Sequence, residues 1–397
     1  MKKLRFYLSV AWGPALIYLL LLVSVVAFLF FRLGSLTPSI SEPEKDTLSH
    51  LVSRDLGMRE IVQEPQFLPY QLGIYFFEKV GLASPFIARS LGALIGLAAV
   101  ISFYYILSRW HTNRIALLAT LLLLTSSWFL HTARLATPEV SFLLLLPLVA
   151  CGAWLNDTQR RDHFTLAAAA LSAGLLLYIP GMIWFVLAGL VWQRKRVRLS
   201  LASFTPWQIL LVGVLGMAVL APIVIAASDR PAMLLTIIGL PDHLIGWKEV
   251  LANLADIPKQ LFVRGPSDPA YWLGSTPLLD AFTAAMFIIG LYASYFRLRL
   301  DRTKLQLFGL VVGSALIAAG TATLSILIPL VYILVAAGIG FMLQQWFTVF
   351  PRNPLARGIG WALISIAIAT TCFYNVKHYF VAWPNTPSVK ASFSERL

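Results

Sequence analysis

The sequence has little charge and little cysteine. Only 12% of its 397 residues are charged and 58% are hydrophobic, whereas soluble domains carry about 25% charged residues. Both cysteines, Cys151 and Cys372, lie in apolar runs, so they indicate neither a disulfide framework nor a redox compartment. A Cys/His metal motif, a P-loop and a Gly-x-Gly-x-x-Gly turn before a helix are also missing. The composition excludes an ordinary soluble domain, and the motifs give no sign of a zinc or nucleotide site.

Long apolar runs are what the sequence has in abundance. A helix that crosses a bilayer needs about 20 predominantly apolar residues, and such runs recur along the chain. The pattern predicts an all-α polytopic membrane protein, a single transmembrane domain over residues 1–397 with about eleven spans. The expected spans are 10–31, 86–108, 115–131, 139–155, 164–178, 180–193, 207–227, 277–296, 305–320, 323–344 and 358–376.

Two of these boundaries depend on helix breaks. Residues 164–192 form one apolar stretch, which as a single helix would be about 43 Å long, well over a hydrocarbon core of about 30 Å. The Pro180-Gly181 pair in its middle favours two short helices. The apolar stretch 305–343 has the same excess length, and the segment 320–325 (GTATLS) supplies its break.

The distribution of charge predicts which side of the membrane each loop faces. The net charge is +13, and with eleven spans more than half of the basic residues fall in short segments on one side, together with only three acids, Asp157, Asp162 and Asp301. By the positive-inside rule that side is the cytoplasm. We therefore expect a cytoplasmic N-terminus, an outer C-terminus, and two large outer loops, 33–85 and 228–276, in a plasma (inner) membrane of bacterial type. Because the basic residues cluster between apolar runs, we expect membrane lipids as partners and no nucleic acid.

The first outer loop opens on the acidic segment 39–47 (SISEPEKDT). Ser41 or Glu42 could cap a helix, and acids in a first turn gain about 0.3–1 kcal/mol each from the helix dipole. A functional interpretation instead needs an ionised carboxylate near an acceptor hydroxyl, or a divalent cation such as Mg²⁺ or Mn²⁺ held by Glu42 and Asp46. Two interfacial helices, 46–61 and 68–82, are expected to follow.

The segment 134–139 (RLATPE) supplies a second acid. Glu139 falls in the first turn of a predicted helix, where it could be a structural partner of Arg134. Ionisable groups near the membrane surface are more often functional, which makes Glu139 a candidate catalytic residue and Arg134 a candidate phosphate binder. The other candidates for substrate binding are Glu44, Tyr70, Arg89 and Arg264. Arg264 is preferred among the outer cations because it precedes a Gly/Pro/Asp loop that faces back toward the bilayer. His243, Tyr271 and Trp272 in the same outer loop could contact sugar or lipid, although Trp and Tyr are also enriched at every membrane interface.

These segments carry a resemblance to a known family. The first helix, the acidic outer loop, a Pro-rich segment and Arg89 at the start of the second helix come in order, followed by 109–140 (RWHTNRIALLATLLLLTSSWFLHTARLATPEV). The pattern resembles the GT-C class of membrane glycosyltransferases, in particular the protein O-mannosyltransferase and aminoarabinose-transferase branch. The similarity is best over residues 36–155 and weak beyond, and the loop 264–280 (RGPSDPAYWLGSTPLLD) looks like one in bacterial relatives.

The resemblance implies a cell-envelope enzyme that transfers a sugar from a polyprenyl-phosphate donor to a protein, lipid or glycan acceptor on the outer face. It implies an inverting displacement in which an acid of the first outer loop is the base or a metal ligand; by position this is Glu42, with Glu44 in reserve and Glu139 lining the same cavity. The sequence departs from the family pattern in having Ser41-Glu42 for an Asp-Glu pair, Leu68 for a basic residue, and no Arg in 323–326. These departures leave the donor sugar open.

Two other functions remain open at this point. One is a transporter or flippase for lipid-linked glycans; the near absence of charge within the spans argues against ion coupling, since a central charge costs about 2.5–3.5 kcal/mol on insertion scales. The other is a catalytically silent cell-envelope scaffold, which would bind donor without turning it over.

Overall fold

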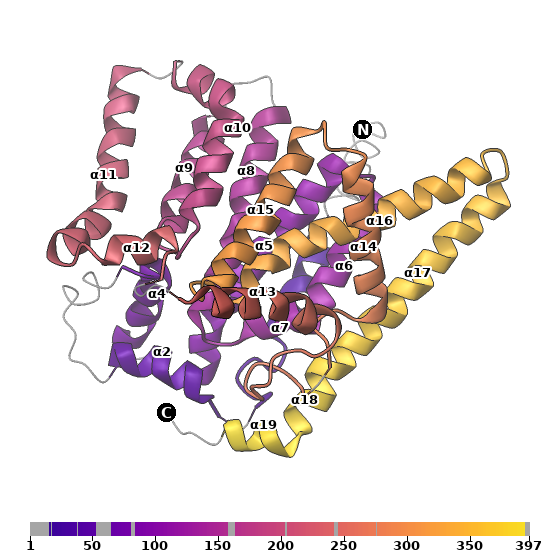
Figure 1. Cartoon of the computed structure of the whole chain (residues 1–397), viewed down its shortest axis with the longest axis horizontal. Helices are drawn as coiled ribbons and strands as arrows, with labels where there is room; N and C mark the ends of the chain where they lie inside the picture. Colours follow the sequence, from indigo (N-terminus) through magenta and orange to yellow (C-terminus); the bar gives the residue numbers. More distant parts are fainter. Residues whose placement is uncertain are drawn as a thin grey trace, which may run out of the picture.

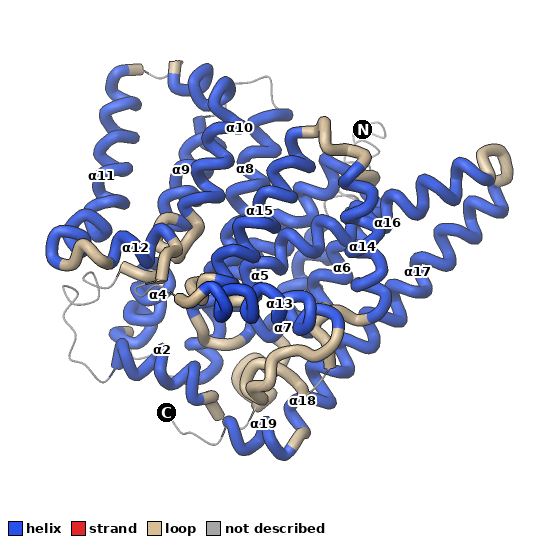
Figure 2. Tube along the Cα trace, in the orientation of Figure 1, coloured by secondary structure: helices blue, strands red, loops and turns tan. Residues whose placement is uncertain are grey.

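The computed structural model describes residues 16, 18–37, 39–52, 65–80, 84–157, 163–202, 205–241, 245–274 and 276–393. Within these ranges every regular element is a helix, as Figure 2 shows. The predicted all-α fold is therefore confirmed. His243 lies outside the described residues.

Long helices standing roughly side by side form the body of the molecule (Figure 1). Its most buried member is α16, of which nearly every residue of the first half is buried. The long helices are α5 (Pro85–Trp110), α6 (Asn113–Thr125), α8 (Leu145–Asp157), α9 (His163–Leu176), α10 (Ile183–Leu201), α11 (Pro206–Asp229), α14 (Ala281–Tyr295), α15 (Asp301–Ala318), α16 (Ile328–Val349) and α17 (Pro354–Lys377). Short 3₁₀ segments, η1 (Pro138–Leu144) and η2 (Leu324–Leu327), lead into α8 and α16.

The helices confirm a polytopic membrane protein but not its exact number of spans. Among the described residues, five helices are long and apolar enough to cross a bilayer, or six if one bent pair is a single span. Shorter apolar helices at Tyr18–Phe30, Leu166–Leu176 and Ala281–Tyr295 fall within other predicted spans. The count of eleven stays a prediction.

The bent pair departs from the single helix predicted over 115–131. Helix α6 ends at Thr125, α7 (Ser127–Arg134) follows at an angle of 61°, and Ser126 lies between them. The Ser126 side chain accepts a hydrogen bond from the backbone N–H of Phe129, which is the cap of a new helix. The bend turns α7 toward the short helices at one end of the bundle.

Both predicted helix breaks are confirmed. Helix α9 ends at Leu176 and α10 begins at Ile183, while α15 ends at Ala318 before η2. The breaks contain Gly181 at φ +73° and Gly320 at φ +71°, a left-handed backbone conformation that glycine adopts without a steric penalty.

Helices α14 and α16 pack closely enough to require glycine. A Cβ atom on Gly290 would lie 1.9 Å from the carbonyl oxygen of Leu334, and one on Gly338 would lie 2.0 Å from that of Met286. In both directions the obstacle is backbone, which cannot rotate away. Small residues of this kind allow membrane helices to approach each other closely.

We therefore expect Gly290→Ala to destabilise the protein by roughly 1–3 kcal/mol, the range for overpacking, or more if α14 must separate from α16. The measurement is the free energy of unfolding in detergent. Gly213→Ala on α11 is the matched control, because nothing lies within 4 Å of its added Cβ and Ala is favoured over Gly in a helix by about 1 kcal/mol. Equal stability of Gly290→Ala and the unmodified protein would contradict this account of the packing.

Short helices gather at one end of the bundle, the lower half of Figure 1. They include α2 (Glu42–Val52) and α4 (Leu68–Lys79) from the first predicted outer loop, and α12 (Met233–Ile238) and α13 (Trp247–Phe262) from the second. Helix α2 begins directly after Ser41, four residues before the predicted 46–61 helix, and residues 53–64 lie outside the described part. After α17 the chain returns to this end as the π-helical η3 (His378–Ala382), α18 (Trp383–Asn385) and α19 (Pro387–Ser392).

Candidate functional site

The start of α2 places Glu44 inside the protein. Ser41 precedes the helix, and its backbone N–H and its hydroxyl both donate to Glu44 Oε2, at 2.9 and 3.1 Å. A glutamate at the third helical position that reaches back to the capping residue is half of a capping box. This local arrangement, encoded by Ser41-Glu42-Pro43-Glu44, turns the Glu44 carboxylate away from solvent, and the residue is 0% exposed.

A buried ion pair joins Glu44 to α5. Arg89 donates through Nε to Glu44 Oε1 at 2.7 Å and through Nη2 to Oε2 at 2.8 Å. The guanidinium also donates to the carbonyl oxygens of Leu33 and Ser39, and Glu44 Oε1 accepts from the backbone N–H of Ala136. The pair therefore links the first loop and the α7–η1 connection to α5. The hydrogen bonds of both side chains are made within the protein.

Electrostatics keep this carboxylate ionised. Burial alone would raise the pKa of Glu44, but the hydrogen bonds and charge of Arg89, with the backbone bonds from Ala136 and Ser41, outweigh it and leave the pKa below its usual value. Glu44 is thus a fixed anion that already has its cation.

The two other acids of α2 point the other way. Glu42 and Asp46 are exposed and lie one helical turn apart. Among the described residues, no group of three or more His, Cys, Asp or Glu side chains could hold a metal ion, and no hydrogen bond or ion pair joins Glu42 to Glu139 or Arg134. The structure does not bring the two predicted catalytic acids into direct contact.

Arg134, the last residue of α7, is a buried cation with spare donors. It is 2% exposed, and its Nη2 donates to the carbonyl oxygen of Phe31. Its Nε and Nη1 have no hydrogen-bond partner among the described residues. The guanidinium carbon lies 5.2 and 4.7 Å from the ring centroids of Tyr379 and Phe380. The two aromatic rings therefore stabilise the positive charge, while the Nε and Nη1 donors stay available.

Four further side chains near this end have buried polar atoms without partners in the described part of the chain: the Tyr70 hydroxyl, both ring nitrogens of His131, His378 Nδ1 and Glu139 Oε2. Burial first, and then the charges of Glu44 and Glu139, raise the pKa of the Tyr70 hydroxyl. Native proteins rarely leave buried polar atoms unpaired. Several donors and one carboxylate oxygen gathered in one region favour a bound polar ligand or waters.

The C-terminal segment forms an aromatic wall behind these groups. Tyr379 stacks on Trp383, with ring centroids 5.4 Å apart, and both contact the His131 ring at 4.8 and 4.5 Å. Trp383 in turn packs against Phe393, whose ring lies 5.8 Å from the Arg89 guanidinium carbon. The wall therefore runs from Arg134 to Arg89 and brings the described C-terminal residues to the same end as the first loop.

The loop after α13 forms another side of the candidate site. Tyr271 is half-buried, and burial first, then the charges of Glu139, Asp268, Glu44 and Asp46, raise its pKa. Trp272 is buried; its ring lies 5.2 Å from that of His131, and its indole N–H donates to the carbonyl oxygen of Thr276. Arg264 is exposed where this loop leaves α13, and among the described residues no hydrogen bond, ion pair or ring contact joins its side chain to the buried group.

The site therefore gathers Tyr70, Arg89, Arg134 and Glu139, with Glu44 as the fixed partner of Arg89, while Glu42, Asp46 and Arg264 lie at exposed positions. Sequence reasoning did not single out His131, Tyr379, Trp383 or Phe393. His131 precedes Arg134 by three residues on a helix, a spacing that places both on one face. The aromatic run 378–383 after the last predicted span was the available signal for the wall.

Comparison with solved structures finds this fold in ArnT from Cupriavidus metallidurans. The apo structure aligns with a TM-score of 0.60 and 13% sequence identity over 96% of this chain and 78% of ArnT. ArnT bound to undecaprenyl phosphate aligns at 0.53 and 14%, over 94% and 76%. The oligosaccharyltransferase of Archaeoglobus fulgidus, tethered with an acceptor peptide, aligns over 95% of this chain and 59% of its own length, at 13% identity and a TM-score of 0.48.

No family model and no curated protein sequence matches the chain. What the structural likeness shows, at this low identity, is a shared fold. The chain has the fold of ArnT, in agreement with the all-α polytopic architecture that the sequence resemblance predicted.

Proposed function

We propose that this chain is a membrane glycosyltransferase that takes a sugar from a polyprenyl-phosphate donor and passes it to an acceptor, with inversion at the anomeric carbon. The observation that carries the proposal is the buried Arg134, whose Nε and Nη1 have no partner among the described residues, five positions before Glu139, whose Oε2 also has none. The GT-C fold, found also in ArnT bound to undecaprenyl phosphate, supports a lipid-linked donor. The acceptor class, whether protein, lipid or glycan, is left open.

Arg134 is proposed to bind the phosphate of the donor. A guanidinium donates to phosphate oxygens from several planar N–H groups, and Nε and Nη1 of Arg134, which lie on different edges of the group, are the nitrogens left unpaired. Negative charge on the phosphate grows as the bond to the sugar breaks, so a fixed cation in a buried site stabilises the transition state more than the bound donor. The Tyr70 hydroxyl is a second donor for the same group.

A carboxylate is proposed to take the proton of the acceptor. The acceptor hydroxyl oxygen bonds to the anomeric carbon, the bond from that carbon to the phosphate oxygen breaks, and the hydroxyl proton passes to the carboxylate. Glu139 is the better placed of the two predicted catalytic acids because its Oε2 is buried and free. Glu42, exposed on α2, is the alternative base and requires the acceptor to approach over that helix.

A divalent cation is not built into this chemistry. Glu42 and Asp46 would supply two carboxylates to Mg²⁺ or Mn²⁺, with water and donor phosphate as the remaining ligands, which is how Mg²⁺ is commonly held. Glu44 does not fit, because Arg89, Ser41 and Ala136 occupy its oxygens. No step is assigned to a metal, and Arg134 supplies positive charge without one.

The working end is proposed to face the outside of a plasma (inner) membrane. The basic end of α10 (194–198) and the turn 296–300 between α14 and α15 lie at the other end of the helices (Figure 1), which the positive-inside rule assigns to the cytoplasm. On this assignment the C-terminus and the two large loops lie outside, with the lipid tail of the donor remaining in the bilayer.

Substitution of the two acids separates their roles. In nanodiscs, with a panel of polyprenyl-phosphate sugars, we expect Glu139→Gln to lower the rate of polyprenyl phosphate release by roughly 10²–10⁴-fold, the usual contribution of general base catalysis. We expect Glu42→Gln to change it less, since its carboxylate is exposed. Glu249→Gln, at an exposed acid in the first turn of α13, is the matched control.

A large loss of release rate in Glu42→Gln, with little change in Glu139→Gln, would assign the general base to Glu42 on α2. Rates unaffected by either change would keep the enzyme class and overturn the assignment of both acids. Donor binding without release in the unmodified protein would contradict the proposed function.

A further inference from the structure

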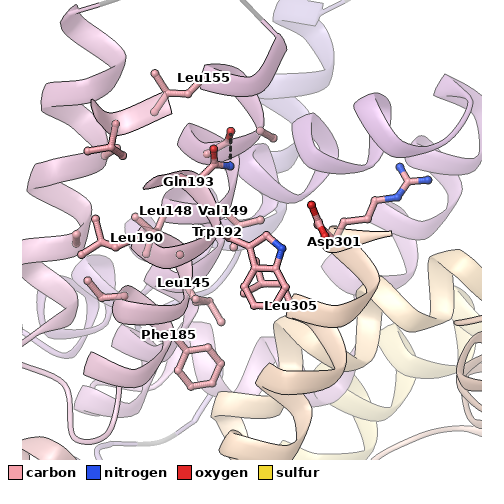
Figure 3. Close-up of a pocket in the computed structure, with 18 of the residues that line it drawn as sticks. Leu145, Leu148, Val149, Leu155, Phe185, Leu190, Trp192, Gln193, Asp301 and Leu305 are labelled. Carbon is pink, nitrogen blue, oxygen red and sulfur yellow. Dashed lines mark hydrogen bonds between the residues drawn. The ribbon is translucent and has the colours of Figure 1, made fainter. Parts of the chain in front are cut away.

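A hollow lies away from the candidate site, between α8, α9, α10, α15 and α16 (Figure 3). Its volume is about 370 Å³, within the range of roughly 300–1,000 Å³ typical of ligand pockets. Nearly all of its wall is apolar, with Leu148, Leu190 and Trp192 among the labelled side chains. Helices α9 and α10 contribute alanine and glycine, which leave the space open; nothing lies within 4 Å of a Cβ added to Gly189.

One end of the hollow is cationic. Arg302, Gln306 and Trp110 line both the apolar hollow and a small adjoining one that also contains Arg297 and His111. The Gln306 side-chain nitrogen is buried without a hydrogen-bond partner among the described residues, and Arg297 donates to Gln344 at 2.9 Å.

The two arginines carry the positive charge of this end. Burial first, and then the charges of Arg302 and Arg297, lower the pKa of His111 to about 4, so its ring is neutral. The one acid lining the hollow, Asp301, is exposed, and Lys304 lies 3.8 Å from its Oδ1. Val197 lines the rim from α10, where the exposed basic residues Arg194, Lys195, Arg196 and Arg198 follow one another without an acid. The polar rim therefore has a net positive charge.

This hollow is separate from the proposed site of sugar transfer. Helix α5 contributes Arg89 to that site and Trp110 to the hollow. The two residues are 21 positions apart on one continuous helix, about 31 Å at 1.5 Å per residue. The donor phosphate at Arg134 and a group at Arg302 thus belong to opposite ends of the bundle.

We propose that the hollow binds one acyl chain of an anionic phospholipid whose phosphate contacts Arg302 and Arg297. An aliphatic chain is the ligand that matches an apolar wall within a membrane protein, and the cationic rim selects a headgroup of net negative charge. Because lipid tails are already in hydrocarbon, transfer from water contributes nothing to this binding. Selectivity comes from the arginines, roughly fivefold for each basic residue near the headgroup.

Tryptophan in the wall allows a direct test of the tail. Phosphatidylglycerol with brominated acyl chains quenches indoles that it contacts, and we expect it to quench a fluorescence component that Trp192→Phe removes. Gly189→Leu adds a side chain at the wall of the hollow, where nothing lies within 4 Å of the added Cβ. It should raise the lipid concentration needed for that quenching at least tenfold. Gly213→Leu on α11, also in open space, is the matched control for the same substitution on a lipid-facing helix. Equal quenching in the two leucine variants overturns the proposal.

The headgroup is tested with the same readout. Arg302→Gln and Arg297→Gln are each expected to weaken the binding of brominated phosphatidylglycerol by about fivefold, without changing the binding of brominated phosphatidylcholine. Arg299→Gln, at an exposed arginine between them in sequence, should leave both lipids unchanged. Equal preference for the two lipids in the unmodified protein, or displacement of phosphatidylglycerol by an unlabelled polyprenyl phosphate at a tenth of its concentration, overturns the assignment to a phospholipid.

Discussion

Replacing Arg134 by glutamine is expected to lower the rate of polyprenyl phosphate release at saturating donor by roughly 10²–10³-fold, the cost of removing one preorganised donor aimed at developing charge. The side chain is 2% exposed and has two N–H groups without partners. The variant removes the charge and the planar fork together. The measurement is the single-turnover rate in nanodiscs.

Arg134→Lys separates charge from geometry. A lysine keeps the positive charge but lacks the fork, and is expected to give a rate between those of the glutamine variant and the unmodified protein. Arg230→Gln, at an exposed arginine after α11, is the control, and Arg264→Gln tests the other predicted phosphate binder. If Arg264→Gln loses activity while Arg134→Gln retains it, the phosphate site lies at the loop after α13 instead.

Replacing Glu44 by glutamine is expected to reduce the free energy of unfolding by about 3–5 kcal/mol, because it leaves Arg89 buried without a counter-charge. Both side chains are almost fully buried, at 0% and 3% exposure. Since the pKa of Glu44 lies below its usual value of 4.5, the contribution of the pair is present above that pH and is lost as pH falls through the lowered pKa. Unfolding in detergent, followed as a function of pH, measures both effects.

A double substitution checks the cause. Arg89→Met with Glu44→Leu removes both charges, and the combined loss should be smaller than the sum of the two single losses. The loss will not vanish, because the carbonyl oxygens of Leu33 and Ser39 and the N–H of Ala136 lose their partner. Additive losses would show that the two residues act independently and would contradict the buried pair.

The helical architecture could be predicted from apolar run length and helix breakers. The Pro180-Gly181 and Gly320 breaks follow from local chemistry, since a run too long for one span needs a turn and glycine permits it. The bend at Ser126 was missed because its cap competes with a continuous apolar pattern, and hydropathy does not detect a side-chain hydrogen bond to the backbone.

The candidate site could be predicted only in part. The sequence indicated Arg134 and Glu139 from their position between two apolar helices. It did not show that Glu44 rather than Glu42 faces inward, because that choice depends on where α2 begins and on Arg89, 45 positions further along the chain. The aromatic wall depends on the return of residues 378–393 to the first loop, a long-range contact that no local pattern encodes.

The most direct test of sugar transfer is turnover by the unmodified protein in nanodiscs, with a panel of polyprenyl-phosphate sugars and Arg134→Gln measured beside it. We predict that at least one donor releases free polyprenyl phosphate, that the transferred sugar has the inverted anomeric configuration, and that release falls with Arg134→Gln. Binding of donors with no release of polyprenyl phosphate from any of them would contradict the account and favour a transporter or a cell-envelope scaffold.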